Sequence, residues 1–233
     1  MTRCSFLCKI TYMNIFNKNI KLVIFDLDGT LIDSTSLWSD VDRKFFERRG
    51  QQIPESYAKE IAHIGLQAAG KLTKEKYFPN EKVNDIINEW HQLSIEAYEK
   101  EIPLKPFAKE FLDYLYRNNI KIALATANSD FLYRPCLKRL GIEKYFSFII
   151  DVNSCKEGKD SPEIFDRVVN NFSLQREDTL IFEDSLQALM TTYNAGYNVV
   201  AVYDKCSTKD IDATKKHSHL LINDFSDMLN LVK

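Results

Sequence analysis

The stretch KLVIFDLDGT at residues 21–30 constrains the fold of this chain more than any other segment. Residues 22–25 are four consecutive apolar residues of types that favour strands, and the run is too short for a helix. A continuous apolar run is typical of a strand in a parallel sheet that helices cover on both faces. The stretch therefore predicts a buried strand that ends at Asp26, at the sheet edge where open α/β folds bind ligands.

Asp26 and Asp28 form a pair of acids directly after this strand, and Gly29 follows them. Their side chains lean to the same side if the extended geometry continues. Two carboxylates this close repel each other unless a cation lies between them or one is protonated. Mg²⁺ prefers such oxygen ligands, and a carboxylate beside it can attack phosphorus. Asp and Gly are also ordinary turn formers, so a solvated turn is the alternative interpretation.

The segment from residue 104 onward alternates between strand and helix patterns. Such alternation is typical of a parallel sheet with helices on its faces. The predicted fold class is α/β, with a Rossmann-like doubly wound parallel sheet. Strands are predicted at 120–126, 146–151, 179–184, 198–204 and 219–224, and helices at 107–116, 131–140, 162–169 and 185–195.

Residues 34–103 differ from the rest because they are charged, helical in their periodicity and poor in strand signals. An apolar stripe at helical spacing, which Trp38 begins and Val41, Phe45 and Phe46 continue, predicts a helix from about residue 38 to Gly50. Further helices are predicted at 55–64 and at 83–98. The segment IGLQAAG interrupts them as a loop. We therefore expect an inserted helical segment at 34–103, a core domain at 20–33 and 104–233, and an N-terminal tail at 1–19, of which residues 1–12 are dispensable.

The composition excludes several classes of partner. The 233 residues carry a formal net charge of −2 without a basic cluster, so nucleic-acid binding is not expected. No run approaches the roughly 18 apolar residues that span a bilayer, so no membrane partner is expected either. The cysteines are odd in number and lack metal-binding spacing, which predicts reduced thiols in a cytoplasmic protein. We expect this protein to be a monomer.

The sequence DLDGT, followed by LIDS, resembles the first motif of the haloacid dehalogenase-like (HAD) superfamily of phosphohydrolases. The similarity is to the branch with a helical cap inserted just after this motif, which includes β-phosphoglucomutase and phosphoglycolate phosphatase. It implies that the inserted segment 34–103 is an α-helical cap. The resemblance implies that Asp26 is the nucleophile and Asp28 the general acid/base. Members that cleave carbon–halogen bonds lack the second Asp, so Asp28 favours phosphoryl transfer.

The second and third motifs of the family also have matching residues. Thr126 ends the strand in ALATANS, and its hydroxyl and the backbone amide of Ala127 would hold a phosphate oxygen. Lys159, in GKDSPEIF, resembles the Lys that neutralises the transferring phosphate and the nucleophile. Asp160 stands where relatives commonly carry Pro, which adds a negative charge near the site.

The fourth motif of the family is EDS, and it matches Glu183, Asp184 and the following Ser. Helix capping is the structural alternative for such acids. The resemblance implies Mg²⁺ as the cofactor, with Asp26, Asp28 and Asp184 as its ligands. Glu183 would lie just outside the ligand set or contact the ion through water.

The functional hypothesis is a Mg²⁺-dependent phosphatase that hydrolyses a small phosphorylated metabolite, such as a sugar phosphate, through an aspartyl-phosphate intermediate. A β-phosphoglucomutase-like isomerase is the alternative. Trp38 stands where those mutases carry His, and Ala68 where their cap loop carries a phosphate-binding Arg, so both residues favour the phosphatase. A catalytically silent binding protein is disfavoured by the intact acidic residues and Lys159.

Overall fold

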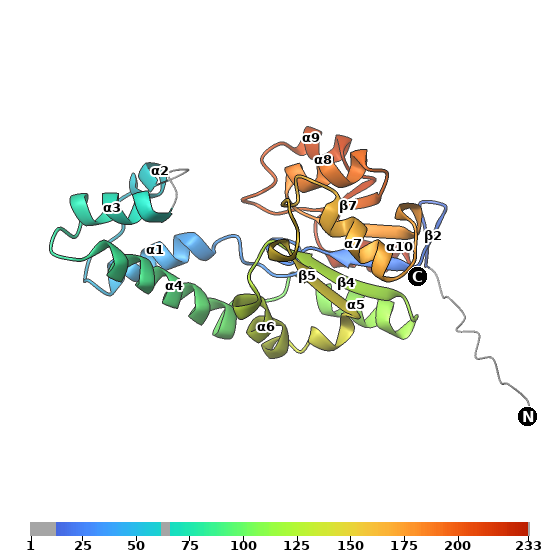
Figure 1. The fold of residues 1–233 in the computed structure, drawn as a ribbon, viewed down its shortest axis with the longest axis horizontal. Coiled ribbons are helices and arrows are strands. Elements are labelled where there is room, and N and C mark those ends of the chain that lie inside the picture. The colour runs from blue at the N-terminus through green and yellow to red at the C-terminus, as the bar shows by residue number, and fades with distance from the viewer. Residues whose placement is uncertain (1–12, 62–65, 233) are drawn as a thin grey trace, which may run out of the picture. The chain divides into compact units, whose positions relative to one another are not determined.

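Two compact units make up the computed structural model, which describes residues 13–61 and 66–232 (Figure 1). The core unit joins the segment that ends at Thr35 to the segment that begins at Pro103, and the cap unit is Ser36–Ile102. The insert thus starts two residues later and ends one residue earlier than the sequence prediction of 34–103. Residues 1–12 and the end of the helix predicted at 55–64 lie outside the described residues.

The core unit is built on a six-stranded parallel sheet in the order β5-β4-β3-β6-β7-β8. From β3 the chain moves outward to β5 and then crosses to the other side of β3, so the strand order reverses there. The predicted doubly wound parallel sheet is confirmed, and the end of β3 lies at the switch point. The strands are β3 (Leu22–Phe25), β4 (Lys121–Thr126), β5 (Phe148–Asp151), β6 (Thr179–Glu183), β7 (Asn198–Val202) and β8 (Leu220–Ile222).

Helices pack on both faces of the sheet. On one face, α7 (Glu163–Asn171) and α8 (Leu186–Asn194) contribute Phe165 and Leu189 to a buried apolar cluster with Ile24 of β3. On the other face, α5 (Ala108–Arg117) and α10 (Phe225–Leu231) bring two phenylalanines against the rings of Phe25 and Phe182. Burial on both faces explains why β3 is continuously apolar.

The remaining elements of the core unit are short connections around this sheet. α6 (Asp130–Arg139) follows β4, and α9 (Ile211–Lys216) lies between β7 and β8. Neither α9 nor α10 is predicted from the sequence, because each is too short to give a clear helical period. Single 3₁₀ turns form at η1 (Glu143–Tyr145), η2 (Val152–Ser154) and η3 (Arg176–Asp178).

A β-hairpin precedes β3 and corrects the prediction of a tail through residue 19. β1 (Met13–Ile15) pairs antiparallel with β2 (Lys18–Ile20). Phe16 and Asn17 connect them with φ of 53° and 58°, as a tight hairpin turn requires of its two central residues. Phe is unusual at positive φ, and the strands have three residues each, so the sequence carries little hairpin signal.

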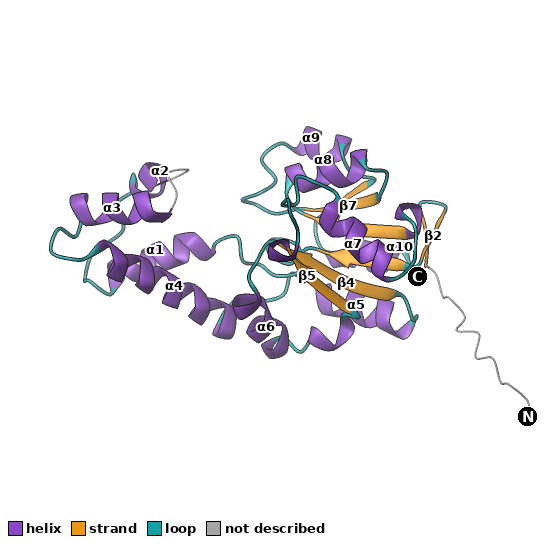
Figure 2. Cartoon of the chain, viewed as in Figure 1, coloured by secondary structure: helices purple, strands orange, loops and turns teal. Residues whose placement is uncertain are grey.

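The cap unit is helical, and among the described residues strands occur only in the core unit (Figure 2). Its helices are α1 (Leu37–Glu47), α2 (Tyr57–Ile61), α3 (Leu66–Lys76) and α4 (Val83–Lys100). Phe45, Phe46, Phe78 and Trp90 form its aromatic centre. None of the helices in the described ranges is long and apolar enough to cross a membrane.

The interpretation of IGLQAAG as a loop is wrong for the residues that the structure describes. Leu66 to Gly70 form the first turns of α3, while residues 64 and 65 lie outside the described part. A side chain at Gly70 would lie 3.0 Å from Cγ1 of Ile87 on α4. The small residues therefore allow α3 and α4 to approach each other. Small residues are typical of loops, but a close contact between two helices requires them as well.

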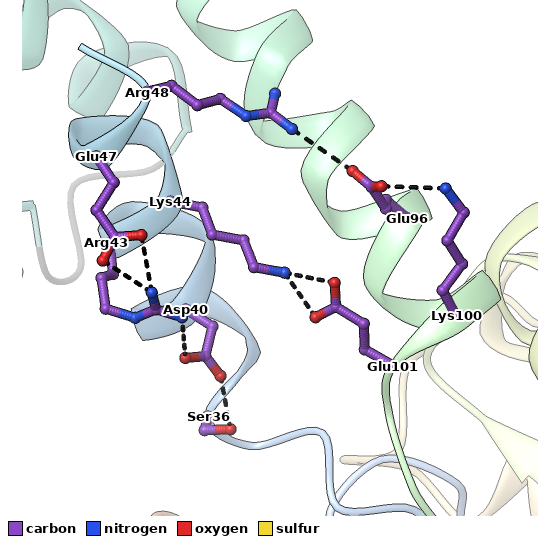
Figure 3. A network of polar contacts seen from close by, with 9 residues as sticks. All are labelled: Ser36, Asp40, Arg43, Lys44, Glu47, Arg48, Glu96, Lys100 and Glu101. Atoms are coloured by element: carbon purple, nitrogen blue, oxygen red, sulfur yellow. Dashed lines mark hydrogen bonds and ion pairs between the residues drawn. The ribbon is translucent and has the colours of Figure 1, made fainter. Parts of the chain in front are cut away.

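Ion pairs connect α1 to the C-terminal half of α4 (Figure 3). Lys44 Nζ lies 2.6 Å from a carboxylate oxygen of Glu101, and Arg48 lies 3.5 Å from Glu96. These side chains are between 26% and 51% exposed, so each pair contributes about 0–1 kcal/mol to the free energy of unfolding. The buried aromatic contacts, rather than this network, hold the two helices together.

Candidate active site

The carboxyl ends of three neighbouring strands bring the predicted site residues to one edge of the sheet. β3 pairs in register with both β4 and β6. One residue beyond β3, Asp26 is therefore level with Ala125 and Glu183, and Thr126 is the next residue of β4. The backbone N–H of Asp26 donates to the carbonyl of Phe182 at 3.0 Å, which extends the ladder by one residue. A cavity of about 540 Å³ opens here, and its wall includes Asp26, Asp28, Ala127, Lys159, Glu183 and Asp184.

Lys159 lies between two of the buried acids. Its ammonium group contacts Asp26 Oδ1 and lies 2.7 Å from Glu183 Oε1. Burial lowers the pKa of Lys159, but the charges of Asp26 and Glu183 outweigh this effect and raise it above its usual value. The lysine is therefore a fixed cation beside the carboxylate at the end of β3.

Glu183 has both carboxylate oxygens engaged by groups of the chain itself. Oε1 accepts from Lys159, and Oε2 accepts the backbone N–H groups of Asp184 and Ser185, each at 3.0 Å. Burial raises the pKa of Glu183, and Lys159 opposes that rise. Its geometry suits the predicted place just outside a metal's ligand set, because it holds Lys159 and the turn that carries Asp184.

Asp26, Glu183 and Asp184 form a buried acidic cluster whose oxygen atoms lie within 4.8 Å of one another. Burial, and then the charges of Asp26 and Glu183, raise the pKa of Asp184 to about 8. A divalent cation would remove this repulsion, and an all-oxygen donor set is the one that Mg²⁺ prefers. Both carboxylate oxygens of Glu183 already accept hydrogen bonds from the chain. Asp26 and Asp184 are therefore the carboxylates of this cluster that fit as metal ligands.

The carboxylate of Asp28 is not one of the three acids of this cluster in the described chain. Its Oδ1 accepts from the Ser34 hydroxyl at 2.7 Å, and its Oδ2 accepts from the Asn128 amide at 2.9 Å. These two bonds account for the orientation of the side chain. Asp28 lines the same cavity as Asp26 and Asp184, and its role as a metal ligand stays a prediction.

Asn128 is a site residue that the sequence interpretation missed. Its backbone N–H donates to Thr126 Oγ1 at 3.0 Å, its side-chain oxygen accepts the Ser129 N–H at 2.8 Å, and its amide reaches Asp28. Because Thr126 Oγ1 accepts the hydrogen bond from the Asn128 N–H, the hydroxyl hydrogen of Thr126 points away from that N–H group. The available sequence signal is an Asn two residues after a strand end and directly before Ser129, the N-cap of α6.

A family model described as haloacid dehalogenase-like hydrolase matches residues 23–202. The chain belongs to the haloacid dehalogenase-like hydrolases. This confirms the family, the fold class and the hydrolase class predicted from the sequence. The matched segment contains Asp26, Thr126, Lys159 and Asp184.

Several named proteins resemble this haloacid dehalogenase-like hydrolase at low identity. The phosphorylated carbohydrates phosphatase of Thermotoga maritima is 26% identical over 177 residues, which cover 76% of this chain and 82% of that protein. The phosphoglycolate phosphatase of Photorhabdus laumondii is 25% identical over 225 residues, covering 92% and 93%. The crystal structure of a Thermotoga maritima protein provisionally named β-phosphoglucomutase matches with a TM-score of 0.78 at 25% identity, covering 87% and 94%.

The position of Asp184 in this hydrolase requires a glycine at residue 29. Its φ is +80°, and a Cβ there would lie 2.8 Å from Asp184 Cγ and still closer to Oδ2. The Thr30 hydroxyl donates to the other oxygen of Asp184 at 3.2 Å. The turn after β3 therefore approaches Asp184 as closely as a residue without a side chain allows.

We expect Gly29→Ala to displace Asp184 and reduce kcat/KM by a factor on the order of 10², because small misplacements of a reacting group have large kinetic costs. The Mg²⁺ concentration that gives half-maximal activity should rise as well. Gly141→Ala is the matched control, since Gly141 has φ of +66° with no atom within 4 Å of the added Cβ. Equal activities of the two variants would show that the approach to Asp184 is unimportant.

Proposed function

We propose that this chain is a Mg²⁺-dependent phosphatase that hydrolyses a small phosphorylated metabolite through an aspartyl-phosphate on Asp26. The observation that carries the proposal is that Asp26 contacts a fixed cation, Lys159, and clusters with a second buried acid, Asp184, in the wall of one cavity. Phosphoryl transfer needs positive charge around the transferring oxygens and a nucleophile in line with them. The names of the phosphatase relatives support the same reaction class.

In the proposed first step, a carboxylate oxygen of Asp26 bonds to phosphorus while the bond from phosphorus to the alcohol oxygen breaks. Asp28, protonated at this stage, gives its proton to the departing alcohol. Lys159, the Thr126 hydroxyl and the Ala127 N–H stabilise the negative charge that spreads over the phosphoryl oxygens. Mg²⁺ held by Asp26 and Asp184 would supply further neutralisation of that charge.

In the second step, Asp28 is a carboxylate and takes a proton from a water molecule as the water oxygen bonds to phosphorus. The bond to Asp26 breaks, and inorganic phosphate leaves. The hydrogen bonds from Ser34 and Asn128 help to orient the carboxylate of Asp28 for this step. When Asp28 carries a proton, the Ser34 hydroxyl can rotate to accept a hydrogen bond from the carboxyl group instead of donating one.

Phosphate release from p-nitrophenyl phosphate, a generic aryl phosphate, tests the proposal. We expect release in the presence of Mg²⁺, loss of release when EDTA removes the ion, and recovery when Mg²⁺ is added in excess. The acidic cluster explains this dependence, because without the ion the repulsion among Asp26, Glu183 and Asp184 remains. Undiminished release in EDTA would overturn the requirement for a metal.

A β-phosphoglucomutase-like isomerase is the second candidate, favoured by the structural match to the protein provisionally named β-phosphoglucomutase. Trp38 and Ala68 replace the His and Arg that the mutases use, which supports hydrolysis instead. We expect β-glucose 1-phosphate to yield free phosphate with no glucose 6-phosphate, as followed by a coupled dehydrogenase assay. Glucose 6-phosphate formed without free phosphate would establish the isomerase.

A further inference from the structure

The cap unit contains a cavity of about 420 Å³, to which all four of its helices contribute. Its wall is mostly apolar and includes Ile61 of α2, and Leu66 and Ala69 of α3. The volume lies in the range of sites that bind small molecules. The residues of this wall lie in the cap unit, outside the cavity that Asp26 lines.

Asp42 is the charged residue in this wall, and it has no partner within residues 13–61 and 66–232. It lies on α1, is 6% exposed, and makes neither a hydrogen bond nor an ion pair there. Burial raises its pKa to about 7. The nearby phenol of Tyr57 is bonded to Thr73 rather than to Asp42. A buried carboxyl group is rarely left without a partner unless a ligand supplies one.

Both tryptophans of the chain line the same cavity. Trp38 precedes Asp42 by one helical turn and is 53% exposed, although its place in a helical stripe predicts burial. Trp90 comes from α4, and its indole N–H has no hydrogen-bond partner among the described residues. Aromatic faces attract organic cations, most strongly where water is excluded.

We propose that the cap cavity binds an organic ammonium group, with Asp42 as its anionic partner and Trp38 and Trp90 as its aromatic walls. The proposal goes beyond the proposed function and does not rest on it, because all the residues that line this cavity belong to the cap unit. A sugar fits this wall less well, because its many hydroxyl groups would meet Ile61, Leu66 and Ala69 rather than polar partners.

Titration of the full-length protein with choline, followed by tryptophan fluorescence, tests the binding directly. Because both tryptophans line the cavity, the signal reports on this site. We expect choline to bind with a Kd at least tenfold lower than that of 3,3-dimethylbutan-1-ol, which has the same shape without the charge. Asp42→Asn should abolish this difference while leaving the thermal unfolding temperature unchanged or higher, since it removes an unpaired buried carboxyl group.

Asp40→Asn is the matched control, because Asp40 lies on the same helix but is exposed and bonded to Ser36 and Arg43 (Figure 3). This variant should keep the preference for choline. Equal Kd values for choline and its neutral analogue would overturn the proposal, as would an unchanged preference in Asp42→Asn. Saturable binding of glucose in place of choline would also overturn it and identify a carbohydrate site.

The titration contains neither phosphate nor Mg²⁺, so its outcome is independent of the phosphatase proposal. Choline should bind equally well to Asp26→Asn, in which the proposed nucleophile is absent. Choline binding without phosphatase activity would refute the proposed function alone, whereas phosphatase activity without a preference for choline over its neutral analogue would refute the cap site alone.

Discussion

Asp26→Asn is expected to abolish phosphate release, with kcat reduced by at least about 10⁴-fold, as removal of a covalent nucleophile does in other enzymes. Asn has the same shape, and its side-chain oxygen still accepts from Lys159, so the fold should persist. It has no carboxylate oxygen with which to form the aspartyl-phosphate. The measurement is phosphate release from p-nitrophenyl phosphate at saturating Mg²⁺, together with thermal unfolding of both proteins.

Asp33→Asn is the control for this substitution. Asp33 belongs to the same loop after β3, but its side chain is 56% exposed and lies 3.9 Å from Lys105. We expect its kcat to stay within about twofold of the wild-type value, since a weak exposed ion pair contributes little. Substantial activity in Asp26→Asn would mean that water attacks the substrate directly or that another residue is the nucleophile.

Lys159→Met should have the second largest effect. The apolar side chain leaves Asp26 and Glu183 without the cation that lies between them. We expect kcat/KM to fall by a factor on the order of 10² to 10³, the range seen when a group that stabilises transition-state charge is removed. The free energy of unfolding should fall by about 3 kcal/mol, because a buried charged pair loses one partner. Urea denaturation and steady-state kinetics measure the two effects.

Lys21→Met provides the comparison for Lys159→Met. Lys21 also pairs with an acid, Asp178, at 2.8 Å, but its side chain is 29% exposed. Its loss should lower the free energy of unfolding by no more than about 1 kcal/mol and leave kcat/KM unchanged. If both lysine variants lost the same stability and neither lost activity, Lys159 would be an ordinary ion-pair partner.

The sheet and its edge were predictable from the sequence because parallel strands carry their own signal. Each apolar run ends in a polar residue, and parallel strands place those ends together, so Asp26, Thr126 and Glu183 could be assigned to one edge. The same reasoning could not find Ser34 or Asn128. Their bonds to Asp28 join residues 6 and 100 positions apart, and the nearness of those residues depends on the packed loops.

The structure differs from the sequence predictions in the cap unit and at the N-terminus, and each difference has a local physical cause. Gly and Ala predict a loop at IGLQAAG, but at Ala69 and Gly70 their small size serves the contact between α3 and α4. The hairpin at residues 13–20 has strands of three residues, too short for a periodic pattern. Trp38 has helical spacing, yet half of its surface is exposed because it lines a cavity.

The aspartyl-phosphate on Asp26 is the claim on which the proposed mechanism depends. Borohydride reduces such an acyl phosphate to homoserine, and peptide mass spectrometry of an acid-quenched reaction locates the altered residue. We expect homoserine at position 26 when substrate and Mg²⁺ are present, and none when substrate is omitted. Continuing phosphate release with no homoserine at position 26, or with homoserine at position 28 instead, would contradict the account.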